Sequence, residues 1–147
     1  MRIFEFLENI KILINKKYDL VFYSESKNYS KLFNLAIKDL SKVNNLKILY
    51  ASSDKEDKLL FTNVDKIYIG KNFILSILFN LIQAKILITT TTDLGNNLLK
   101  KNNKKEKYIY FFHSPVSTHK FYTKSAFDNY DYIFCNGDYQ LIELQKL

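Results

Sequence analysis

The chain has 147 residues, 47% of them hydrophobic and 16% aromatic, which is enough for one domain with a packed core and excludes a disordered tail. Three glycines and one proline are too few for a turn-rich β-sandwich or barrel. The net charge is +7, but the lysines are spread out and Arg2 is the single arginine, which argues against nucleic acid and favours a polyanionic acceptor or an anionic membrane face.

Residues 1–17 predict an amphipathic helix that packs on the sheet, and the alternative is an anchor on the inner leaflet of a membrane. The segment carries Glu5 and Glu8 and lacks a small-residue cleavage site, so it does not resemble a secretory signal. We therefore expect a cytoplasmic protein, with peripheral contact to the inner face of the membrane as an open alternative.

Six short apolar runs follow, each starting about twenty residues after the one before, as expected of repeated βα units. They are Leu20–Tyr23, Leu46–Tyr50, Val64–Ile69, Ile86–Thr89, Tyr108–Phe112 and Tyr132–Cys135. A parallel crossover needs a dozen or more residues beyond its strand, and these intervals supply them. The runs are apolar on both faces, which is typical of strands covered by helices on both sides.

Helical patterns lie between these runs. Residues 32–43 carry one apolar stripe at helical periodicity, and residues 73–82 are apolar all round, which predicts a helix buried in the fold. Residues 93–101 and 123–130 predict two shorter helices, and a last helix opens at residue 141. The lysine-rich run at 100–107 is interpreted as a solvated surface turn.

These elements predict an α/β fold over residues 1–147. Its centre is a doubly wound, mostly parallel, six-stranded Rossmann-like sheet with helices on both faces. Ligands of such sheets bind at the carboxyl ends of the strands. The polar residues that follow each strand are therefore the candidate site residues.

The turn after the fifth run holds both histidines of the chain, within the sequence HSPVSTHK. His113 directly follows a strand, so its imidazole is expected to point into the crevice, where it could act as a general base. A structural histidine bonded to a loop carbonyl explains the sequence equally well. His119 could orient an acceptor or bind phosphate.

Other turns supply further candidates. The first strand is followed by Ser24 and Glu25, the fourth by Thr91 and Thr92, and the sixth by Asn136. We expect the threonine run to offer hydroxyl and N–H groups to an anion at a helix N-terminus. Most of these polar residues are equally well explained as caps that satisfy the backbone N–H groups at the start of the following helix.

The sequence offers no support for a bound cofactor or metal. There is no Walker spacing and no GxGxxG, so a nucleotide site of either kind is not supported. The two histidines lack a suitable third ligand nearby for zinc, and the single cysteine excludes an internal disulfide.

Three segments carry a resemblance to a known family. The segment from Tyr110 to Gln140, YFFHSPVSTHKFYTKSAFDNYDYIFCNGDYQ, resembles the N-terminal domain of the CDP-glycerol glycerophosphotransferase family. VFYSESKNY (Val21–Tyr29) and ILYASSDKEDKLL (Ile48–Leu60) agree with it in the expected order. The resemblance implies a GT-B-like enzyme of two facing Rossmann-like domains, of which this chain is the acceptor-side half.

The resemblance also implies a reaction. CDP-glycerol would sit mainly on a C-terminal donor domain that this chain lacks, and His113 would deprotonate a hydroxyl of a polyol-phosphate or glycan acceptor. The acceptor would contact Ser114, Ser117, Thr118 and His119. The product would be a glycerol-phosphate linkage of teichoic-acid-like polymers, and we expect no transfer by this chain alone, whether it is a fragment, a truncated frame or part of a split enzyme.

Two other functions stay open. The chain could be a non-catalytic module that binds a phosphorylated polymer or a protein partner, or half of another nucleotide-sugar transferase or epimerase. In a transferase, replacing His113 would abolish turnover and leave the fold intact. In a docking module the same change would have little effect.

Overall fold

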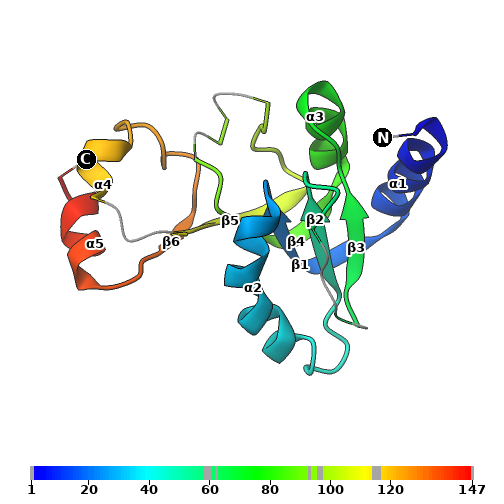
Figure 1. The fold of residues 1–147 in the computed structure, drawn as a ribbon, viewed down its shortest axis with the longest axis horizontal. Coiled ribbons are helices and arrows are strands. Elements are labelled where there is room, and N and C mark those ends of the chain that lie inside the picture. Colours follow the sequence, from blue (N-terminus) through cyan, green and yellow to red (C-terminus); the bar gives the residue numbers. More distant parts are fainter. Residues whose placement is uncertain are drawn as a thin grey trace.

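The computed structural model describes residues 2–57, 61, 63–92, 94–95, 98–113 and 117–146. Its elements are α1 (Ile3–Asn15), β1 (Lys17–Ser24), α2 (Lys27–Leu40), β2 (Ile48–Ser52), β3 (Asp65–Tyr68), α3 (Asn72–Leu81), β4 (Gln83–Thr89), β5 (Lys105–Phe111), α4 (Thr118–Phe121), β6 (Tyr132–Phe134) and α5 (Asp138–Leu144). Along the chain, helices separate most of the strands, but β3 follows β2 and β5 follows β4 with no helix between them in the described residues (Figure 1).

The strands form one six-stranded sheet in the order β3-β2-β1-β4-β5-β6. Every neighbouring pair is parallel, with Leu20 opposite both Ile48 and Ile86, for example. This confirms the predicted α/β fold, and all six predicted strands are present. The order reverses between β1 and β4, which therefore flank the switch point where sheets of this kind open a crevice.

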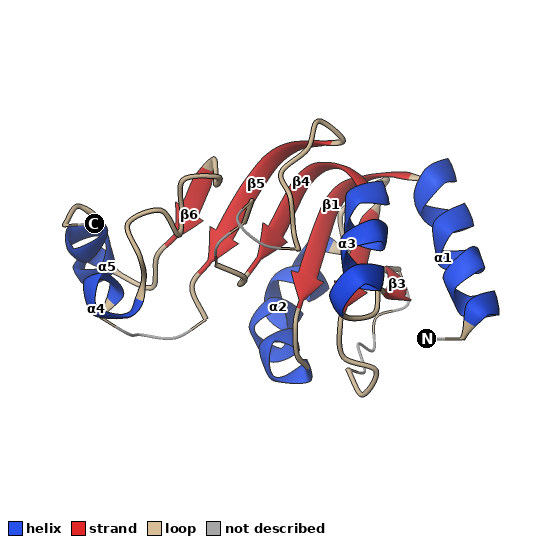
Figure 2. Ribbon diagram, turned by 90° about the horizontal axis from the view of Figure 1, so that it is seen from above, coloured by secondary structure: helices blue, strands red, loops and turns tan. Residues whose placement is uncertain are grey.

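Helices cover both faces of the sheet, as predicted (Figure 2). On one face α1 and α3 lie side by side, and Leu13 and Phe79 are fully buried against the sheet in the larger core cluster. On the other face α2 contributes Phe33 and Ile37, which are also fully buried. The predicted stripe of α2 thus faces the sheet, and the Ser26 side chain caps its first turn by accepting from the Asn28 backbone N–H.

Three helix predictions need correction. Residues 94–95 and 98–101 are not helical, because the chain reverses at Gly95, whose N–H donates to the Leu99 carbonyl at 2.7 Å. Residues 123–130 form tight turns, with hydrogen bonds between residues three apart, so no α-helix forms there. The helix α3 is buried along only one side, since Phe73 at its start is 73% exposed.

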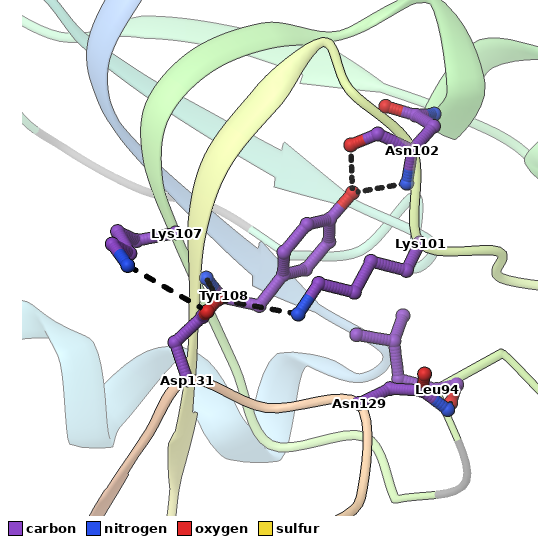
Figure 3. A network of polar contacts seen from close by, with 7 residues as sticks. All are labelled: Leu94, Lys101, Asn102, Lys107, Tyr108, Asn129 and Asp131. Atoms are coloured by element: carbon purple, nitrogen blue, oxygen red, sulfur yellow. Dashed lines mark hydrogen bonds and ion pairs between the residues drawn. The ribbon is translucent and has the colours of Figure 1, made fainter.

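A polar network fastens the connection between β4 and β5 onto the sheet (Figure 3). The Tyr108 hydroxyl accepts from the Asn102 N–H at 2.9 Å and lies 3.2 Å from the Asn102 carbonyl, to which it donates. At the other end of the same residue, the Tyr108 N–H donates to Asp131 at 2.8 Å, and Lys101 and Lys107 pair with that carboxylate. The network holds the segment before β5 and the start of β6 in fixed positions.

The lysine-rich run is not entirely a solvated turn. Lys105, the first residue of β5, is only 3% exposed. Its Nζ lies 4.7 Å from the centre of the Phe79 ring and 3.3 Å from Oδ1 of Asn102. Burial lowers the pKa of Lys105 to about 7, so the prediction of a solvated side chain is wrong for this residue.

Candidate functional site

A cavity of about 490 Å³ opens at the carboxyl ends of β1, β4 and β5. It therefore lies at the switch point of the sheet, where β1 and β4 are neighbours. We call it the switch-point pocket. Its lining residues are Glu25, Tyr29, Leu75, Thr90, Thr91, Thr92, Leu98, Leu99, His113 and Tyr122.

His113 lies two residues beyond the end of β5 and lines this pocket. Its ring packs against that of Tyr29 on α2, with the centroids 4.7 Å apart and the planes tilted by 50°. Burial lowers the pKa of the imidazole, and the nearby Glu25 carboxylate opposes the shift. The ring is therefore neutral near pH 7, which is the state that a proton acceptor requires.

The threonine run after β4 forms another wall. Thr90 is 2% exposed, and the Oγ1 atoms of Thr90 and Thr91 are buried with no hydrogen-bond partner among the described residues. The Nδ1 atom of His113 is likewise buried with no hydrogen-bond partner among the described residues. The Thr91 N–H is used internally, since it donates to Oγ1 of Thr89 at 3.1 Å. No helix begins in the described residues 90–92 and 94–95, so the predicted anion site at a helix N-terminus is wrong here.

The structure brings together four of the predicted site residues: His113, Glu25, Thr91 and Thr92. They come from three different turns, which meet because the strands before them are parallel and adjacent.

The other predicted site residues do not line the pocket. Ser24 is fully buried and donates to the Ser26 carbonyl at 2.7 Å. The side chain of Ser117 and the N–H of Thr118 both donate to the Glu143 carboxylate on α5, and Asn136 is exposed in the turn after β6.

Two of the predicted site residues lie wholly or partly outside the described part of the structure. Ser114 lies outside the described residues, and His119 belongs to α4 but its side chain is outside the description.

Sequence reasoning missed six lining residues: Tyr29, Leu75, Thr90, Leu98, Leu99 and Tyr122. Thr90 belongs to the threonine run that the sequence analysis singled out, so a sequence pattern pointed to it. The two tyrosines had none, because an aromatic residue in an amphipathic segment is indistinguishable from a core residue until the fold is known.

The N-terminus of α2, beside the pocket, is closed by the protein itself. The Lys27 N–H donates to Oδ2 of Asp54 at 3.0 Å, and the Asn28 N–H donates to the Ser26 hydroxyl at 3.3 Å. The Tyr29 N–H donates to the Ser26 carbonyl at 2.9 Å. The Lys27 N–H and the Glu56 N–H, which both donate to Asp54, hold the pKa of its carboxyl below the ordinary value, so this carboxylate acts as a built-in anion.

A second cavity, of about 360 Å³, lies at the opposite edge of the sheet, where β1, β2 and β3 begin. Lys16, Lys17, Lys47 and Asp65 are among its lining residues. Lys16 pairs with Asp65 at 2.8 Å and Lys17 with Glu106 at 3.0 Å, so two of its three cations are already neutralised within the chain. This cavity is at the wrong edge for ligands of open parallel sheets.

In the described ranges, none of the helices combines the length and the apolar character that a membrane-spanning segment requires. His, Cys, Asp and Glu side chains do not gather in threes there in a way that could hold a metal ion.

Comparison with known proteins adds no relative. No protein-family model matches the chain, and neither the curated proteins nor the solved structures contain a significant match. The resemblance to glycerophosphotransferases therefore stays a prediction that depends on the quoted residues.

Proposed function

We propose that the chain is the acceptor-side domain of a CDP-glycerol glycerophosphotransferase-like enzyme, with His113 as the general base. The observation that supports this most is the place of His113 at the switch-point pocket, where burial keeps its imidazole neutral near pH 7. A neutral imidazole beside a pocket large enough for a small polyol is suited to removing a hydroxyl proton.

The proposed step is a displacement at phosphorus. Since Nδ1 is buried, Nε2 is assigned as the atom that takes the proton of the acceptor hydroxyl. The acceptor oxygen forms a bond to the distal phosphorus of CDP-glycerol, the bond from that phosphorus to the bridging oxygen breaks, and CMP leaves with the electron pair. The donor-binding domain would deliver the phosphorus to the mouth of the pocket, so most of the rate would come from positioning and charge stabilisation.

The test is a chimera in which residues 1–147 replace the N-terminal domain of an enzyme of the resembling family. CMP release from CDP-glycerol is measured with a polyol acceptor. Changing His113 to Gln should lower turnover at least a hundredfold, because general base catalysis contributes on the order of 10² to 10⁴. The circular dichroism spectrum should not change.

Asn136→Ala is the matched control, since Asn136 is exposed and does not line the pocket. It should keep its turnover. An H113Q chimera with more than a third of the parent turnover, or a correctly folded parent chimera without activity, would count against the proposal. The parent should also lose activity as the pH falls below 6.5, because protonation of His113 removes the base.

A docking module is the second candidate, and one observation favours it. The elements α4, β6 and α5 lie toward one end of the molecule (Figure 1), and each carries large apolar side chains that are exposed. Phe121 is 72% exposed, Tyr132 55% and Ile142 55%. Exposed apolar residues that gather in one region are typical of interaction surfaces. If docking were the whole function, His113→Gln would leave partner binding unchanged.

A further inference from the structure

We infer that the switch-point pocket selects an uncharged polyhydroxyl unit, such as the terminal residue of a polyol or glycan, and rejects a phosphate group. The inference rests on the proposed function for the identity of this pocket as the acceptor site. It adds which part of an acceptor enters: the hydroxyl-bearing terminus lies inside, and every phosphate, including the reacting one, stays at the mouth.

The charges in the pocket argue against an anion. Among the described residues that line the pocket there is no lysine or arginine, and Glu25 is the one acidic residue. A phosphate inside the pocket would leave water, meet no cation from the lining and face a carboxylate. Each of these effects disfavours the charged ligand, whereas a neutral polyol has no charge to desolvate, needs no cation and is not repelled by the carboxylate.

The N-terminus of α2 also offers no anion site. In dinucleotide-binding sheets of the same strand order, the pyrophosphate is held by free N–H groups at the N-terminus of the helix after the first strand. Here the corresponding helix is α2, and the N–H groups of Lys27, Asn28 and Tyr29 already donate to Asp54 and Ser26. The Asp54 carboxylate occupies the position that a phosphate would otherwise fill.

The remaining lining groups suit hydroxyls. Each threonine hydroxyl can both donate and accept, as a polyol hydroxyl can, and the Oγ1 atoms of Thr90 and Thr91 have no protein partner in the described part of the chain. Buried polar atoms without partners are rare in native proteins, and a hydroxyl group bound in the pocket would give these two atoms a partner. Tyr29 and Tyr122 add aromatic rings that can pack against the C–H groups of a polyol.

The experiment measures binding to the 147-residue chain by saturation-transfer NMR, with titrations of two matched pairs at 150 mM salt. The probes are glycerol against glycerol 3-phosphate and ribitol against ribitol 5-phosphate. We expect each neutral polyol to bind at least tenfold more tightly than its phosphate. Equal or tighter binding of the phosphates, or no saturation transfer to either neutral polyol at 10 mM, would overturn the inference.

Two variants locate the effect. Thr90→Val keeps the shape and removes the hydroxyl, so ribitol binding should weaken at least fivefold, while the exposed Thr123→Val should leave it unchanged. Glu25→Lys should admit glycerol 3-phosphate at least ten times more tightly than the parent chain does. Glu8→Lys, which makes the same change of net charge on the exposed side of α1, should not. If the controls match the pocket variants, binding occurs elsewhere and the inference fails.

These outcomes separate the inference from the proposed function. Preferential polyol binding with an H113Q chimera of full activity would overturn the proposed function and leave the neutral site in place. A His113-dependent transfer combined with equal binding of the phosphates would overturn only the selectivity.

Discussion

Lys105 makes the stability of this protein depend on pH in an unusual direction. The residue is 3% exposed, and burial, with a smaller contribution from Lys104, lowers the pKa of its amine from 10.5 to about 7. Between these values the unfolded chain binds a proton that the folded chain does not, so the free energy of unfolding rises with pH. From pH 7 to pH 9 the increase due to this one group is about 2 kcal/mol.

Lys105→Met isolates that contribution, because it keeps the length and apolar stem of the side chain and removes the amine. Urea unfolding followed by circular dichroism at pH 7, 8 and 9 should show that the variant is more stable than the wild type, with a gap that narrows by about 2 kcal/mol towards pH 9. Burial raises the pKa of Tyr18 and Tyr23, so above pH 9 these tyrosines make the free energy of unfolding fall as the pH rises. The comparison therefore ends at pH 9.

The exposed Lys124→Met serves as the control and should follow the wild type at every pH. The reasoning is refuted if K105M and wild-type protein show parallel pH dependence. That outcome would mean that the Lys105 amine is protonated and solvated in the folded chain.

Three further changes test the packing and the polar contacts of the fold, each by the free energy of unfolding measured in urea. Gly95→Ala should destabilise by about 1–2 kcal/mol, because Gly95 has φ +94° and an added Cβ would lie 2.5 Å from Nδ2 of Asn129. Asp131→Asn should lower the free energy of unfolding by about 1–2 kcal/mol at pH 7. Despite burial, the Tyr108 N–H and two lysines lower the pKa of Asp131, so this loss of stability should shrink as the pH falls below 3.8. Phe79→Ala should cost about 3–5 kcal/mol through a cavity under α3.

The strands could be predicted from the sequence, but their order could not. Runs such as Tyr108–Phe112 are apolar on both faces, and this pattern is expected of any strand that helices cover on both sides, whichever strands are its neighbours. The intervals between runs predict parallel crossovers. Which strands become neighbours depends on how α1, α2 and α3 divide between the two faces, and no local pattern carries that information.

The helices expected at residues 93–101 and 123–130 show where local patterns fail. The apolar spacing of Leu94, Leu98 and Leu99 looks helical, but Leu94 and Leu99 are buried from a loop that doubles back at Gly95. The side chain of Asn129 donates to the Leu94 carbonyl and ties the two segments together. Local turn hydrogen bonds, together with this one bond between residues far apart in the sequence, thus replaced the helical ones.

The site was predictable only as far as topology determines it. His113 and Glu25 follow strands, and any parallel sheet places such residues at one edge. The tyrosines at positions 29 and 122 reach the pocket through the packing of α2 and of the segment after α4, so their role required the structure. Lys105 was misjudged for a related reason, since a lysine among lysines gives no sign that one amine lies under an aromatic ring.

The strand order of this sheet is the one found in dinucleotide-binding folds, yet its first βα turn contains no glycine. Glycines in that turn let a ligand backbone approach the helix N-terminus, which holds the phosphates by its free N–H groups. Here Asp54, in the turn after β2, accepts from the Lys27 N–H, so the positive end of α2 is neutralised within the fold. Because the Asp54 carboxylate supplies the negative charge at this helix N-terminus, the turn needs neither a nucleotide phosphate nor the glycines that would let one approach. The pocket beside it is then free for a ligand that is recognised by its hydroxyl groups.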